Sequence, residues 1–79
     1  MASTPRVVVY SAAGCHLCEA SLEVVRHVCG DDFELIAIDG VAELEERYRE
    51  HLPVVEIDGE RAFTFFVDPD GLRARLTGA

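Results

Sequence analysis

The segment Cys15-His16-Leu17-Cys18 most restricts what this chain can fold into, because it places a C-x-x-C pair between a strand pattern and a helix pattern. The preceding run Val7–Tyr10 is β-branched and aromatic without a polar break, which predicts a central strand buried on both faces. After Ser11–Gly14 interrupts this run, apolar residues recur at helical spacing and predict a helix over Cys15–Cys29. The residues on its expected buried face are Cys18, Leu22, Val25 and Cys29.

Strand and helix patterns alternate along the rest of the chain. The expected elements are, in order, a strand at Phe33–Ile38, a helix at Val41–Glu50, strands at Val54–Ile57 and Arg61–Val67, and a helix that begins at Asp68-Pro69. Asp58-Gly59 predicts a tight hairpin turn between the last two strands, because glycine accepts a positive φ without steric cost. The order β-α-β-α-β-β-α predicts an α/β fold with a four-stranded mixed sheet covered by helices, in which the first two strands run parallel. The length predicts a single domain over residues 1–79.

The middle helix is expected to turn Val41, Leu44 and Tyr48 toward the core. Leu52-Pro53 ends this helix, since the residue before a proline is disfavoured in the α region.

The charge balance excludes several classes of partner. Fifteen acidic residues stand against seven arginines and no lysine, which gives a net charge of −8. Binding to nucleic acid or to an anionic membrane needs clustered basic residues, so neither partner is expected. The absence of lysine together with abundant alanine, valine and arginine is typical of a GC-rich bacterial genome.

The apolar segments are too short for either a secretory signal or a membrane span. A signal needs an apolar stretch of about 7–15 residues, and Met1–Arg6 is mostly polar. No stretch approaches the roughly 18–20 apolar residues of a transmembrane helix. We therefore expect a cytoplasmic protein, in which an odd count of three cysteines is better explained by a reactive pair and one buried thiol than by structural disulfides.

A C-x-x-C pair at the start of a helix suits thiol–disulfide exchange. Cys15 falls in the first turn, where free backbone N–H groups and the helix dipole favour a thiolate, which is the nucleophilic form. Cys18 lies one turn further on the buried face, and a shielded second thiol is what such an exchange requires. His16 either lowers the pKa of Cys15 as an imidazolium or points into solvent without effect. Cys29 lies about 16 Å along the helix from Cys18, too far for a disulfide, and is expected to fill the core.

Metal binding is the alternative use of the two sulfurs. A structural zinc ion takes four ligands, usually from two cysteine pairs. This chain has no second pair, and neither His27 nor His51 has a convincing ligand spacing. We therefore expect no metal site and no cofactor.

The motifs of the chain resemble those of the glutaredoxin/thioredoxin superfamily. Cys15-His16-Leu17-Cys18 after Val7–Tyr10, with Leu52-Pro53-Val54-Val55 before a hairpin, carries the resemblance, which extends over essentially the whole chain and looks most like the compact bacterial glutaredoxin-like group of DUF836 type. It implies a thioredoxin-like fold of glutaredoxin type, with Cys15 as nucleophile and Cys18 as resolving thiol. It also implies that Pro53 is a cis-proline and that the Leu52 backbone binds the substrate as an added strand.

The chain departs from the glutaredoxin pattern at positions that serve glutathione. His16 replaces the usual proline after the first cysteine, Ala12 replaces a basic residue, and His51 replaces a threonine. Val67-Asp68-Pro69-Asp70-Gly71 stands where the family has a Gly-Gly and Asp signature. We therefore expect weak glutathione specificity.

The resemblance and the motif together predict a thiol–disulfide oxidoreductase that needs no prosthetic group. Its expected substrate is a disulfide-containing protein or a low-molecular-weight thiol. One alternative is a binding or adaptor protein of the same fold without redox turnover, and another is a zinc or copper carrier that uses the C-x-x-C. A monomer is expected, because no exposed apolar stripe remains once the predicted faces are buried.

Overall fold

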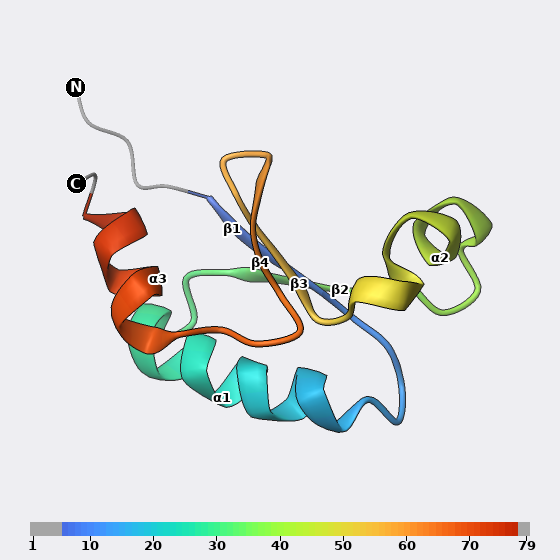
Figure 1. Cartoon of the computed structure of the whole chain (residues 1–79), viewed down its shortest axis with the longest axis horizontal. Helices are drawn as coiled ribbons and strands as arrows, with labels where there is room; N and C mark the ends of the chain where they lie inside the picture. The colour runs from blue at the N-terminus through green and yellow to red at the C-terminus, as the bar shows by residue number, and fades with distance from the viewer. Residues whose placement is uncertain (1–5, 78–79) are drawn as a thin grey trace.

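The computed structural model describes residues 6–77, which form one mixed four-stranded sheet with helices on both faces (Figure 1). The elements are β1 (Val7–Ser11), α1 (His16–Cys29), β2 (Glu34–Ala37), α2 (Ala42–Tyr48), a 3-10 turn η1 (Arg49–His51), β3 (Val54–Ile57), β4 (Glu60–Thr64) and α3 (Pro69–Leu76). The strands are ordered β2-β1-β3-β4. β1 and β2 are parallel, and the other two pairs are antiparallel. The predicted order of elements and the α/β fold class are confirmed.

Alternation along β1 divides the core between the two faces of the sheet. Val7 and Val9 point to the face covered by α1 and α3, where they pack with Val55, Val25 of α1 and Leu72 of α3. This face is mostly apolar, with Ser11 and Ser21 as its buried polar residues, and its burial provides the main stabilisation of the fold.

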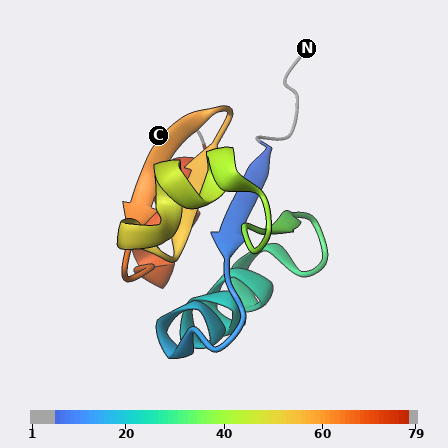
Figure 2. The ribbon, with the colours of Figure 1, turned by 90° about the vertical axis from the view of Figure 1, so that its right-hand side faces the viewer.

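The opposite face is smaller and is covered by α2. Tyr10 lies here with Val54, Ile38 and Tyr48. The rings of Tyr10 and Tyr48 stack with centroids 4.0 Å apart, and the Tyr48 hydroxyl donates to Glu56 at 2.8 Å. Figure 2 shows α2 and α1 on different sides of the sheet.

The hairpin turn at Asp58-Gly59 is found as predicted. Both residues take left-handed backbone angles, with φ of 53° and 83°. Asp58 also ties the turn to the start of β1, because its carboxylate accepts from the Arg6 N–H at 2.9 Å while its own N–H donates to the Arg6 carbonyl.

Two local expectations are wrong. β4 ends at Thr64 rather than at Val67, because Phe65 takes a φ of 65° and turns the chain out of the sheet. Val41 does not face the core: it is the extended N-cap of α2 and is exposed. The described chain exposes the large apolar side chains of Leu17, Leu35, Val41, Phe65 and Phe66, and the expectation of a monomer stays a prediction.

Among residues 6–77, every helix falls short of the length and apolar character that a membrane span requires.

Candidate functional site

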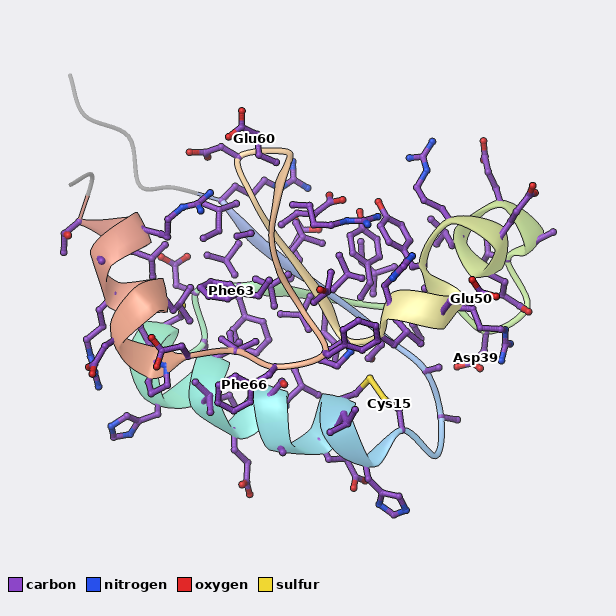
Figure 3. All side chains as sticks on the ribbon, viewed as in Figure 1. Cys15, Asp39, Glu50, Glu60, Phe63 and Phe66 are labelled. Carbon is purple, nitrogen blue, oxygen red and sulfur yellow. A yellow bond between two sulfur atoms is a disulfide. The ribbon has the colours of Figure 1, made fainter. Side chains whose placement is uncertain are left out.

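The register of the sheet brings three loops to one of its ends. Tyr10 near the end of β1 pairs with Val54 at the start of β3, and Val54 pairs with Thr64 at the end of β4. The segment that leads to Cys15, the Leu52–Pro53 segment and Phe65 therefore leave the sheet side by side. Figure 3 shows the disulfide of Cys15 at this end of the molecule. We call it the disulfide end and the opposite one the hairpin end.

Cys15 is the N-cap of α1 rather than a residue of its first turn as expected. Its backbone is extended, and its Sγ accepts the Cys18 N–H at 3.2 Å, one of the N–H groups that have no partner within a helix. Gly14 makes this possible, since its φ of 74° reverses the chain just before the helix. The sulfur of Cys15 thus occupies the place where a helix binds an anion.

Cys15 and Cys18 form a disulfide and differ in their exposure. Their Cα atoms are 5.2 Å apart, which lies within the normal range for a disulfide. Cys15 is half-buried, whereas Cys18 is 2% exposed. An incoming thiol therefore reaches the sulfur of Cys15 before that of Cys18.

His16 points away from the two sulfurs. Its side chain is 97% exposed, and its Nδ1 lies 3.8 Å from a carboxylate oxygen of Glu19. When protonated it pairs with this carboxylate, which counters its charge. The geometry favours the solvated histidine, and an effect of His16 on Cys15 stays a prediction.

Asp39 anchors the segment that leads to Cys15. Its carboxylate accepts from the Ala13 N–H at 2.9 Å, next to a backbone bond from the Ile38 N–H to the Ser11 carbonyl. This contact was not among the predictions made from the sequence. The sequence signal for it is the position of Asp39 two residues after β2, because the carboxyl ends of two parallel neighbouring strands lie at the same edge of a sheet.

The peptide bond between Leu52 and Pro53 is cis, as the family resemblance implied. Leu52 is half-buried and packs against Ile38, Tyr48 and Val54, and Pro53 is buried. The Pro53 carbonyl accepts from the Phe65 N–H at 3.0 Å, which fixes Phe65 beside the proline. The substrate-binding role of Leu52 and Pro53 stays a prediction.

Phe65 and Phe66 were not predicted as site residues, because both fall inside the strand expected at Arg61–Val67. Phe65 is 47% exposed and Phe66 is 68% exposed. The Phe65 ring meets the His51 ring edge-on, with centroids 5.9 Å apart. The sequence does contain a signal that the strand ends here. The alternation of apolar and polar residues stops between Phe63 and Val67, where three aromatic residues follow no fixed period.

Cys29 lies apart from this site. It is free, half-buried and packed against the core, as predicted. Burial, and secondarily the charge of Asp32, raises the pKa of its thiol, which disfavours the reactive thiolate. Within residues 6–77, no three histidine, cysteine or acidic side chains gather as metal ligands.

Comparison with known proteins is consistent with these observations. The family model described as a glutaredoxin-like domain (DUF836) matches residues 6–77. The crystal structure of the structural-genomics target XcR50 from X. campestris is 30% identical, with a TM-score of 0.79 over 92% of this chain and 97% of that one. The solution structure of Ne2328 from Nitrosomonas europaea is 33% identical, with a TM-score of 0.71 over 96% of this chain and 95% of that one.

A more distant likeness concerns the fold alone. A thioredoxin from Malassezia sympodialis, Mala s 13, is 19% identical, with a TM-score of 0.64 over 95% of this chain and 74% of that one. No curated protein matches the sequence significantly. The predicted thioredoxin-like fold of glutaredoxin type is confirmed by these likenesses.

Proposed function

This chain belongs to the glutaredoxin-like domain family (DUF836), and we propose that it works as a thiol–disulfide oxidoreductase. The proposal rests on one observation. A half-exposed Cys15 caps a helix with its sulfur and is disulfide-bonded to a buried Cys18. This arrangement supplies an accessible nucleophile and a shielded second thiol, the two groups that exchange requires.

The proposed cycle transfers two electrons and keeps every sulfur in balance. The Cys15 thiolate attacks one sulfur of a substrate disulfide, forms a mixed disulfide and releases the other substrate sulfur as a thiolate. The Cys18 thiol loses its proton to solvent and attacks the Cys15 sulfur. The second substrate thiolate leaves, and the Cys15–Cys18 disulfide is formed, the oxidised state found here. Run backwards, the same steps oxidise a substrate dithiol.

The proposed substrate is a protein disulfide or a low-molecular-weight thiol, bound along the backbone of Leu52 in the manner of an added strand. Weak glutathione specificity is part of the proposal. Its support is that Ala12 stands where glutaredoxins carry a basic residue, and that this side chain packs against the core instead of reaching the surface. We further propose that the protein acts as a cytoplasmic monomer and uses no cofactor.

A redox titration tests the proposal. The purified protein is equilibrated across thiol/disulfide buffers, its free thiols are trapped with a mass-tagged alkylating agent, and each species is counted by mass spectrometry. Wild type, Cys15→Ser and the control Cys29→Ser are compared. We expect Cys15 and Cys18 to interconvert as one two-electron couple in wild type and in Cys29→Ser, and no intramolecular couple in Cys15→Ser.

The other outcomes separate the alternatives. A pair that stays protected by bound zinc or copper favours a metal carrier and contradicts the proposal. A pair that does not close, in a protein that still binds its partner as Cys15→Ser, favours an adaptor.

A further inference from the structure

The backbone of Phe65 conflicts with its residue type. Its φ of 65° lies in the left-handed region, which bulky residues rarely adopt and glycine adopts freely. Two backbone hydrogen bonds hold it there: the Phe65 N–H donates to the Pro53 carbonyl, and the Phe66 N–H donates to the Thr64 carbonyl. A phenylalanine at such a position is unfavourable for the fold. Strain of this kind, observed in a structure, points to a role for the side chain itself.

The side chain of Phe65 is not used to fill the core. Phe65 is 47% exposed, and its neighbour Phe66 is 68% exposed. Leu17, between the two cysteines, is 55% exposed. The backbone contact of Phe65 with Pro53 places the Phe65 ring at the disulfide end. The exposed Phe65 and Leu17 thus come from two segments at the disulfide end, whereas Phe66 follows Phe65 and lies farther from Cys15 (Figure 3). In the free protein all three side chains leave apolar area in water.

The charged residues of this end are mostly acidic. Glu19 in the first turn of α1, Asp39 after β2 and Glu50 in η1 are exposed, and Figure 3 shows Asp39 and Glu50 at this end of the molecule. Arg49 of η1 is paired with Glu45 at 2.8 Å. With a net charge of −8 on the whole chain, this end repels anionic molecules and attracts basic ones.

We propose that Phe65 is a specificity residue, which receives an apolar side chain next to the disulfide cysteine of an extended protein segment without net negative charge, and that Phe66 extends the same apolar surface along that segment. This inference rests on the proposed function and names its substrate class. Contact between an apolar side chain and the two rings removes exposed area from water on both partners. Glutathione disulfide, which is anionic and has no large apolar side chain, gains neither that contact nor the charge attraction.

Single-turnover kinetics test the inference. The protein is reduced, freed of reductant and mixed with one of three octapeptides that each contain an intramolecular disulfide. The first carries leucine beside its cysteine and two lysines, the second serine and two lysines, and the third leucine and two glutamates. The variants are Phe65→Gly and Phe66→Ser. Leu35→Ser is the matched control, because Leu35 is as exposed as Phe65 and lies on β2 rather than at the disulfide end.

We expect wild type to reduce the leucine–lysine peptide about tenfold faster than the serine–lysine peptide, as one apolar contact of this size allows. It should also exceed the leucine–glutamate peptide by about tenfold, because the acidic end repels that peptide. Phe65→Gly and Phe66→Ser should lose most of the preference for leucine over serine. They should keep the preference for lysine over glutamate, while Leu35→Ser keeps both. Phe65→Gly should also melt at the wild-type temperature or higher, because glycine relieves the backbone conflict. A purely structural role for Phe65 predicts the opposite, a lower melting temperature and equal losses on all three peptides.

Failure of the inference is distinguishable from failure of the proposed function. If wild type reduces all three peptides at the same rate, or if both variants retain the leucine preference, the inference is wrong and the oxidoreductase proposal stands. If wild type reduces none of the peptides and shows no Cys15–Cys18 couple in the redox titration, the proposed function is wrong and the inference falls with it.

Discussion

At the hairpin end of the sheet, Asp58 and Gly59 take left-handed φ angles of 53° and 83°, and at the disulfide end Phe65 takes one of 65°. The same backbone requirement is thus met by different residue types. Asp-Gly is the pair that tight hairpin turns prefer, whereas phenylalanine is among the residues least suited to this region. At the hairpin end the residue types suit their backbone angles, whereas at the disulfide end Phe65 does not. Such local departures are expected where a side chain is kept for function rather than for folding.

Each end also has a hydrogen bond in which an aspartate carboxylate accepts a backbone N–H, and these two bonds can be compared. Asp39 accepts the Ala13 N–H and Asp58 accepts the Arg6 N–H, each at 2.9 Å. The bonds are alike in length and type, but only Asp39 holds the segment that leads to Cys15. The effects of removing each bond on the stability of the fold and on the Cys15–Cys18 pair can therefore be compared directly.

The largest effect is expected from Gly59→Phe, which creates at the hairpin end the conflict already present at Phe65. Nothing lies within 4 Å of a Cβ at Gly59, so the cost comes from the backbone alone. We expect the free energy of unfolding to fall by about 2 kcal/mol, with no change in the redox midpoint. Urea unfolding and the thiol-trapping titration measure the two quantities. A stability loss below about 0.5 kcal/mol would show that the left-handed region carries little penalty in this fold and would weaken the comparison.

A smaller effect is expected from Asp39→Ala and Asp58→Ala. Each removes one acceptor from an exposed backbone N–H and should lower the free energy of unfolding by about 1 kcal/mol. Only Asp39→Ala should change the alkylation rate of Cys15 in the reduced protein, because it frees the segment before the helix. Asp39→Asn keeps an acceptor oxygen, so the alkylation rate of Cys15 in this variant should stay close to the wild-type rate. The contrast between the two ends fails if Asp58→Ala changes the rate equally.

Alkaline pH should weaken the disulfide end through Tyr10. Burial, followed by the contact with Tyr48 and the charge of Glu56, raises the pKa of Tyr10 to about 12 from an ordinary value of 10.0. Between these pH values the unfolded chain loses a proton that the folded chain keeps, so the free energy of unfolding falls as pH rises. Because Tyr10 is partly exposed, we expect a loss of about 1 kcal/mol. Unfolding followed from pH 9 to 12 tests this, and Tyr10→Phe should show a flatter pH dependence; equal slopes would exclude Tyr10 as the cause.

The smallest effect is expected from His16→Leu. The ring is exposed and faces Glu19, so its charge is screened from Cys15. The alkylation rate of Cys15 at pH 7 should change by less than about twofold. A change of tenfold would restore His16 as a modulator of the thiolate and show that the solvated geometry does not represent the reduced state.

Much of the fold follows from short-range patterns. The β-branched run of β1, the apolar face of α1, the Asp58-Gly59 turn and the Asp68-Pro69 start of α3 were all predictable, because each depends on residues close together in the chain. The wrong predictions concern residues whose local structure depends on contacts with segments distant in the sequence. The end of β4 depends on how the Phe65 N–H reaches Pro53, and the exposure of Val41 depends on where α2 meets the sheet.

The sequence by itself determined the order of the elements, the strand-to-helix position of Cys15 and Cys18, and the difference in burial between them. These depend on local periodicity and on the chemistry of a helix start. Only the tertiary structure decided which segments stand beside the disulfide. Asp39, Leu52 and Phe65 lie tens of residues from Cys15, and they meet at one end of the sheet because strand register places them there. Register is a property of strand pairing and is not encoded in any one segment.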